Sequence, residues 1–342
     1  MIMTLKKVIS LVMNAKFKSS LSLVFLSLLL FSSCEKEPKN MTLTGPVFGT
    51  GYKVIYYSDK DFTKDFNALF DEINQSMSTY IPDSDISRLN RNESVSIDGH
   101  FKKVFQKSKE VYKETNGFFD PTIGDVVNAW KFGAENKKFL TDSTTIDSLM
   151  NYVGFEKVSL NNSTVEKPKN TYLEFNAIAK GYGVDVIAEF LKGKGIENFL
   201  IEIGGEIRVG GINLDKNEPW KVGLDQPRFD GEQSVYKAIT LTDAAMATSG
   251  TYRKYKVDST GNRYAHIIDT KTGYPSKTNV LSVSVIADNC MTADAYATAF
   301  QAMGLGRVEQ FSEIHPEIKI FFIYDNGSDE LQTLSLNGFP EK

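Results

Sequence analysis

The chain has 342 residues, a formal net charge of −4, 41% hydrophobic residues, two Cys and three His. The apolar fraction is ample for a packed core, and the acidic balance lacks the basic footprint of a nucleic-acid binder, so no nucleic-acid partner is expected. Two Cys exclude a disulfide-rich scaffold and a four-Cys zinc site, and three His allow only a sparse His-based site.

The N-terminus has the parts of a secretory signal. The first 33 residues hold four Lys and no acidic residue, and their apolar run at 21–31 is too short to span a bilayer permanently. Ser32 and Ser33 then precede Cys34, an order that resembles a bacterial lipobox. We expect residues 1–33 to be removed and Cys34 to be lipidated; the alternative is an ordinary signal peptide with a coincidental Cys.

The segment after the signal is polar and lacks periodicity. Residues 34–43 therefore predict a lipidated Cys and a tether that holds the protein off a membrane. No internal repeat and no break in composition follow. We expect one domain over residues 44–342.

Strand and helix patterns then alternate along the chain. Aromatic and β-branched residues predict strands, and apolar residues at helical spacing predict helices. The strands are expected at 51–57, 199–203, 281–287 and 318–324, and the helices at 62–77, 101–112, 184–191 and 292–303. We expect Asn116 and Gly117 to end the second helix and Thr292 to cap the last. Because no regular βαβ rhythm occurs, the order favours an α+β fold with mixed, mainly antiparallel sheets.

The commonest catalytic motifs are absent. The chain holds no G-x-x-x-x-G-K-[ST], H-E-x-x-H, C-x-x-C or G-x-S-x-G, and Gly181-Tyr182-Gly183 lacks the third glycine of a dinucleotide fingerprint. A P-loop, a Rossmann dinucleotide site and the usual hydrolase templates are therefore unsupported.

Two side chains with oxygen atoms lie one helical turn apart near the C-terminus. Asp294 and Thr298 are four residues apart on an expected helix, so both project from one face. A carboxylate and a hydroxyl on one face suit a hard cation such as Mg²⁺, which would neutralise charge during phosphoanhydride cleavage. The alternative is that Asp294 stabilises the helix dipole and Thr298 is an inert surface hydroxyl.

Three other residue types allow two interpretations each. His266, in an expected strand with Tyr264 and Ile268 on the same face, is either a structural residue or a base that activates a hydroxyl. Lys180 either contacts an anionic phosphate or extends its amine to solvent at a helix start. The aromatics either stack on a planar ring or belong to the core; they are Phe48, Tyr80, Phe118 and Phe119.

Taken together and in order, these segments resemble the ApbE family of FAD:protein FMN transferases. The resemblance covers roughly residues 44–325, and such a number of ordered motifs is highly specific. The motifs are Phe48-Gly49-Thr50, Ser78-Thr79-Tyr80, Gly117-Phe118-Phe119-Asp120, Trp130 with Phe132-Gly133, Ile178-Ala179-Lys180-Gly181-Tyr182, Gly204-Gly205, Ala247-Thr248-Ser249-Gly250, His266-Ile267-Ile268-Asp269, Thr272-Gly273-Tyr274-Pro275 and residues 294–298.

The resemblance implies an activity and a role for each matching residue. FAD is bound with Mg²⁺, and its FMN half moves to a Thr or Ser hydroxyl of an acceptor protein with release of AMP. Asp294, Thr298 and the Ala177 carbonyl match metal ligands, and His266 matches the base. The positions that match FAD contacts are Phe48, Tyr80, Phe118, Phe119, Asp120, Glu174, Lys180 and Ile268.

The resemblance also implies a partner and a place. Acceptors carry a motif of the form Asp-Gly-x-Ser/Thr-Ala-Thr, and a subunit of a respiratory membrane complex is expected. Family members are typically lipoproteins, so we expect an anchored protein facing the periplasm, on the inner rather than the outer membrane. Two alternatives stay open: an FAD pyrophosphatase that forms FMN and AMP, and a non-catalytic FAD-binding lipoprotein.

Overall fold

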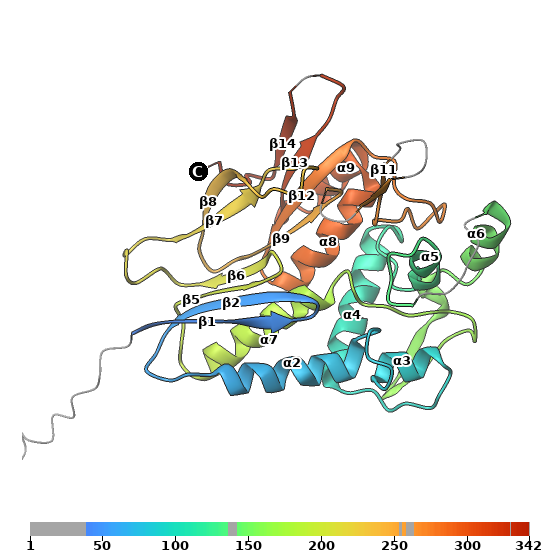
Figure 1. Cartoon of the computed structure of the whole chain (residues 1–342), viewed down its shortest axis with the longest axis horizontal. Helices are drawn as coiled ribbons and strands as arrows, with labels where there is room; N and C mark the ends of the chain where they lie inside the picture. The colour runs from blue at the N-terminus through green and yellow to red at the C-terminus, as the bar shows by residue number, and fades with distance from the viewer. Residues whose placement is uncertain (1–38, 136–141, 253–254, 258–262, 329, 342) are drawn as a thin grey trace, which may run out of the picture. The chain divides into compact units, whose positions relative to one another are not determined.

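An eight-stranded sheet organises the fold in the computed structural model (Figure 1). Its order is β1-β2-β5-β6-β9-β12-β13-β14, and all neighbouring strands in it run antiparallel. The strands are β1 (Asn40–Val47), β2 (Thr50–Tyr57), β5 (Phe199–Ile203), β6 (Glu206–Gly210), β9 (Ala245–Gly250), β12 (Val280–Ala287), β13 (Lys319–Tyr324) and β14 (Gln332–Leu336).

The structure describes residues 39–135, 142–252, 255–257, 263–328 and 330–341. The expected signal peptide and Cys34 lie outside these residues. One compact unit covers Asn40–Lys342, and Asn40–Val47 pairs along its length with β2, so residues 40–43 of the expected tether lie in a strand. Among the described residues, no helix is both long enough and apolar enough to cross a membrane.

Helices pack against one face of the sheet, which we call the helical face. Figure 1 shows α7 beneath β5 and β6, with α8 beside β9, and contacts between these elements agree. The helices are α2 (Thr63–Met77), α3 (Asp85–Asn90), α4 (Gly99–Glu114), α5 (Gly124–Ala129), α6 (Ser143–Met150), α7 (Ala179–Gly193), α8 (Cys290–Met303) and α9 (Leu305–Ile314), with a 3₁₀ turn at Phe155–Lys157.

Three two-stranded sheets complete the described structure. Of these, the hairpin of β7 and β8 packs on the face opposite the helices, which we call the outer face; Trp220, Val222 and Ile239 of the hairpin are buried in one cluster with Met246 and Phe321 of the large sheet. The short strands are β3 (Ser159–Asn161), β4 (Thr164–Glu166), β7 (Trp220–Asp225), β8 (Val235–Leu241), β10 (Tyr255–Val257) and β11 (Arg263–Ala265).

The fold class and the main periodic elements are confirmed. The expected helices correspond to α2, α4, α7 and α8, and the expected strands to β2, β5, β12 and β13. Asn116 and Gly117 have positive φ angles of 49° and 75° just after α4, as a helix end requires. The prediction that Thr292 caps α8 is wrong: the cap is Asn289, whose side chain accepts from the Thr292 amide, so Thr292 lies inside the first turn.

Candidate active site

The N-terminal ends of α7 and α8 lie side by side and are joined by hydrogen bonds. Asp294 Oδ2, on α8, accepts a hydrogen bond from the Gly181 amide of α7 at 2.9 Å. The helices approach so closely that a Cβ on Gly181 would lie 2.4 Å from the Cys290 carbonyl oxygen. Only glycine fits at this position, and its absent side chain allows the Asp294 carboxylate to reach the start of α7.

A second carboxylate at this junction, this time on α7, accepts hydrogen bonds from α8. Asp185, on α7, accepts hydrogen bonds from the Cys290 and Met291 amides at 2.9 and 2.8 Å, which satisfies the first amides of α8. Arg208 pairs with Asp185 at 2.8 Å, and both side chains are nearly buried. Burial raises the pKa of Asp185, and the ion pair with Arg208 acts against that rise.

The junction leaves a carbonyl oxygen available beside Asp294. Because the Gly181 amide donates to Asp294, it does not bond to the Ala177 carbonyl, which receives no backbone hydrogen bond from the residues that the structure describes. Thr298 lies one turn after Asp294 on α8, and its hydroxyl is 3.3 Å from Ser249 Oγ. A carbonyl, a carboxylate and a hydroxyl form an oxygen set that suits a hard cation.

That set contains a single carboxylate. Across the described ranges, no group of three or more His, Cys, Asp or Glu side chains is arranged to hold a metal ion. A cation bound here would therefore be completed by water or by the oxygens of a substrate, as is usual for Mg²⁺.

These groups open into a cavity of about 310 Å³, which we call the central cavity. The structure brings eleven of the predicted site residues to its wall, from segments that are far apart in the sequence. They are Tyr80, Phe118, Phe119, Asp120, Glu174, Ala177, Lys180, His266, Ile268, Asp294 and Thr298.

Phe48 lies in a neighbouring cavity of about 620 Å³, the side cavity. The two cavities share Tyr80, Asn176 and Lys180 in their linings, so they are adjacent. The Phe48 ring packs over α7 at Gly183, where a Cβ would lie 2.6 Å from the ring.

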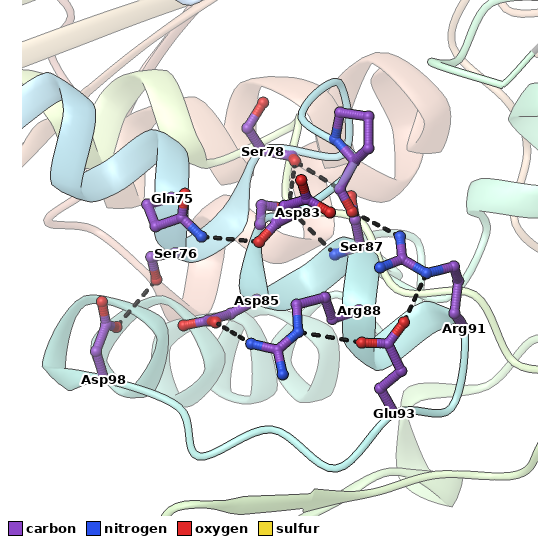
Figure 2. A network of polar contacts seen from close by, with 12 residues as sticks. Gln75, Ser76, Ser78, Asp83, Asp85, Ser87, Arg88, Arg91, Glu93 and Asp98 are labelled. Atoms are coloured by element: carbon purple, nitrogen blue, oxygen red, sulfur yellow. Dashed lines mark hydrogen bonds and ion pairs between the residues drawn. The ribbon is translucent and has the colours of Figure 1, made fainter.

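Tyr80 stands at the mouth of the central cavity and is 61% exposed. The loop that carries it is fixed by polar contacts between α2 and α3, part of which Figure 2 shows. Gln75 Nε2 donates to the Asp83 carbonyl at 2.8 Å, and Ser84 Oγ donates to the Ser78 carbonyl at 2.7 Å. Tyr80 is therefore exposed to solvent, on a loop that these hydrogen bonds fix in position.

Asp120 is a buried carboxyl group in the cavity wall. Its Oδ1 accepts from the amide and the hydroxyl of Thr122 at 2.8 and 2.6 Å, and Thr122 in turn accepts from the Gly154 amide. Burial raises the pKa of Asp120 to about 6, against the lowering effect of the Thr122 hydrogen bonds. A group with this pKa changes its protonation near neutral pH.

Lys180 forms an ion pair with Glu206 of β6 at the floor of the cavity. Glu206 is buried and Lys180 is about a third exposed, so the amine lies in the cavity instead of extending to solvent. Of the two interpretations of Lys180, this placement favours a contact with an anionic ligand.

His266 lies in the cavity wall but not within a strand. β11 ends at Ala265, so the prediction that His266 shares a strand face with Tyr264 and Ile268 is wrong. The chain turns there into a tight hairpin closed by a bridge between Ile268 and Pro275. The His266 ring is 6.4 Å from that of Phe132, centroid to centroid.

Two cations flank the ring of Phe118. Lys271 Nζ lies 5.5 Å and the Arg307 guanidinium 5.0 Å from its centroid. Such contacts orient an aromatic ring that is only partly buried. Phe118 is thereby held in place on the cavity wall beside Phe119.

Asp185 and Glu206 were not singled out from the sequence. Both are acidic residues among apolar neighbours of an expected helix or strand, and this signal could have found them. Their partners, by contrast, are distant in sequence: Asp185 contacts residues more than a hundred positions away.

Residues 48–322 match the ApbE family. A FAD:protein FMN transferase of Vibrio cholerae is 36% identical over 332 residues, covering 92% of this chain and 97% of that protein. One of Haemophilus influenzae is 35% identical over 317 residues, covering 86% and 90%.

Solved structures agree with the sequence relatives. The flavin transferase ApbE of Vibrio cholerae superposes with a TM-score of 0.79 at 34% identity, over 87% of this chain and 97% of that one. The Pseudomonas stutzeri flavinyl transferase ApbE, in its apo form, gives 0.78 at 26% identity over 88% and 96%. Sequence and fold lead to the same conclusion: this chain belongs to the ApbE family.

Proposed function

We propose that the chain is a Mg²⁺-dependent transferase that moves the FMN moiety of FAD to a Thr or Ser hydroxyl of an acceptor flavoprotein, with release of AMP. The observation that carries this proposal is the lining of the central cavity. Aromatic rings, the Lys180 amine, the His266 imidazole and oxygen atoms suited to bind a cation all lie in this one lining. The names of the relatives support flavin transfer.

The residues at the α7–α8 junction fit a divalent cation. Asp294, Thr298 and the Ala177 carbonyl would hold it, and the unpaired state of that carbonyl among the described residues supports the assignment. A Mg²⁺ ion there supplies neutralisation of the negative charge on a pyrophosphate.

The chain's own side chains perform the remaining tasks. Phe118, Phe119 and Tyr80 offer faces on which a planar ring can stack. Lys180 binds phosphate oxygens from the cavity floor. These contacts hold FAD so that its flavin-side phosphorus faces the incoming hydroxyl.

His266 accepts the proton of the acceptor hydroxyl as its oxygen attacks. A bond forms between that oxygen and the flavin-side phosphorus, and the bond from this phosphorus to the bridging oxygen breaks. The bridging oxygen leaves with AMP. The acceptor then carries FMN through a phosphoester.

The test uses the chain without its first 33 residues, FAD, MgCl₂ and a synthetic peptide that contains Asp-Gly-Ala-Thr-Ala-Thr. We expect a fluorescent flavin-labelled peptide with Mg²⁺ and none with EDTA. A peptide whose Thr residues are replaced by Val is the matched control and stays unlabelled. Free FMN and AMP with no labelled peptide would show the pyrophosphatase instead, and bound FAD without turnover would show the binding protein.

We also propose a lipoprotein that is attached through Cys34 and faces the periplasm, at the inner membrane. The lipobox-like residues before Cys34 and the polar segment after it support this proposal. The acceptor would then be a subunit of a respiratory membrane complex. Labelling of the full chain with a radioactive fatty acid, compared with Cys34→Ser, tests the anchor; equal labelling of both would refute it.

A further inference from the structure

The β7–β8 hairpin leaves part of the outer face of the large sheet exposed. Met246 and Phe321, toward one end of the sheet order, are buried beneath it. Toward the other end, Lys53 of β2 is exposed, while Leu200 and Glu202 of β5 are only half-buried. The edge of the hairpin therefore borders a stretch of open sheet.

A groove of about 850 Å³ follows this border, and we call it the outer groove. Lys53, Leu200 and Glu202 belong to its lining on the sheet side. On the other side it is lined by β7, including both Trp220, which points to the sheet and is buried, and Lys221, which is exposed. Successive side chains of a strand point to opposite faces. Because residues from both faces of β7 line the groove, the groove borders the backbone edge of this strand.

β7 belongs to a two-stranded sheet and pairs with β8 alone within the described part of the chain. An open strand edge presents backbone N–H and C=O groups that an extended segment of another protein can pair with.

The outer groove also adjoins the central cavity. Gly204 and Thr248 line both the outer groove and the central cavity, so the two spaces adjoin at these residues. Gly204 and Gly205 form the turn between β5 and β6 with φ angles of 60° and 100°. A Cβ at Gly204 would lie 2.8 Å from Thr50 Cγ2, so only glycine fits between this turn and β2.

We propose that the outer groove receives the acceptor protein as an extended segment, which pairs with the edge of β7 and delivers its hydroxyl past Gly204 and Thr248. This inference rests on the proposed function and names where its protein substrate docks. Main-chain hydrogen bonds to the edge of β7 supply the affinity.

Lys53→Trp tests the docking surface. The change places a large ring in the groove, and Lys53 is exposed and remote from the central cavity lining. We expect the KM for the Asp-Gly-Ala-Thr-Ala-Thr peptide to rise about tenfold, while the Kd for FAD changes less than twofold. The matched control is Lys192→Trp, an exposed lysine on α7 outside the groove, which should leave both constants unchanged.

Hydrogen exchange of the unmodified chain gives a second readout. Adding the same peptide should slow exchange of the amides in Trp220–Asp225, as strand pairing requires. An unchanged KM in Lys53→Trp, or unprotected β7 amides, overturns the docking proposal even if the peptide is labelled normally. Consumption of FAD without any labelled peptide refutes the proposed function instead, so the two failures are distinct.

Discussion

The two faces of the eight-stranded sheet are built in opposite ways. On the helical face, α7 and α8 pack so tightly that Gly181 has no room for a side chain and Cys290 is fully buried. On the outer face, the outer groove lies between the sheet and β7, a strand that pairs with β8 alone among the described residues. We propose that the tightly packed helical face carries the chemistry and that the outer face receives the acceptor.

The difference between the two faces shows which part of the protein must position its ligands accurately. A cation and a phosphate must be placed within fractions of an ångström, which rigid and mutually bonded helices achieve. A protein substrate must enter and leave, which a groove with spare backbone groups allows. Changes on the helical face should therefore abolish turnover or stability, and changes in the outer groove should alter only acceptor affinity.

The largest effect is expected from Asp294→Asn. The amide keeps the size of the side chain and can still accept from Gly181, but it removes the charge that would hold the cation. We expect kcat to fall about a thousandfold and calorimetric Mg²⁺ binding to disappear, with thermal stability preserved. Asp288→Asn, an exposed carboxylate just before α8, is the matched control and should behave like the unmodified chain. Undiminished Mg²⁺ binding in Asp294→Asn would refute the assignment.

Asp185→Ala should break the junction of α7 and α8. It leaves Arg208 nearly buried without its main partner and the Cys290 and Met291 amides unsatisfied. We expect chemical denaturation to show a loss of about 3 kcal/mol in the free energy of unfolding, and Mg²⁺ affinity to fall.

A double variant separates the two roles of Asp185. Combining Asp185→Leu with Arg208→Leu removes both charges, so most of the stability should return. The Mg²⁺ affinity should stay low, because the start of α8 is still not held. Recovery of both properties would mean that Asp185 acts on stability alone.

His266→Ala should separate chemistry from binding. His266 lies in the cavity wall on a hairpin, outside the junction of the helices. We expect kcat to fall about a hundredfold while the Kd for FAD, measured by fluorescence quenching, stays within a few-fold. His315→Ala, at the end of α9, is the matched control. An unchanged transfer rate would remove His266 as the base.

The smallest effect concerns the pH dependence of stability. Because burial raises the pKa of folded Asp120 from 3.8 to about 6, the native state holds a proton between these pH values that the unfolded chain has released. This carboxyl therefore lowers stability as the pH rises through that window. Asp120→Asn should be more stable than the unmodified chain by about 2 kcal/mol above pH 6. Denaturation curves at pH 4 and pH 7.5 should show this gain shrinking at the lower pH; an equal gain at both would contradict it.

Local patterns were sufficient for the periodic elements and for the family. The apolar spacing in α2 and α4 depends on which residues face the core, so the sequence alone predicts these helices. The strand β12 was also predicted, although it is buried on both faces. The ordered motifs were specific enough to predict the family, which is confirmed. The resemblance predicts eleven of the residues that line the central cavity.

What local patterns could not predict depends on distant contacts. The cap of α8 is Asn289 and not Thr292, a choice between two polar residues three positions apart that only backbone geometry decides. The Asp185–Arg208 pair, the Lys180–Glu206 pair and the outer groove join elements whose proximity follows from the sheet order. No spacing rule within a single helix or strand contains that information.

One measurement tests the central claim most directly: the stoichiometry of products when the chain, FAD and Mg²⁺ react with the Asp-Gly-Ala-Thr-Ala-Thr peptide. Liquid chromatography with mass spectrometry quantifies AMP, free FMN and flavin-modified peptide in one run. The account predicts one modified peptide for each AMP, with little free FMN. Equal amounts of AMP and free FMN, with the peptide unmodified, would contradict it.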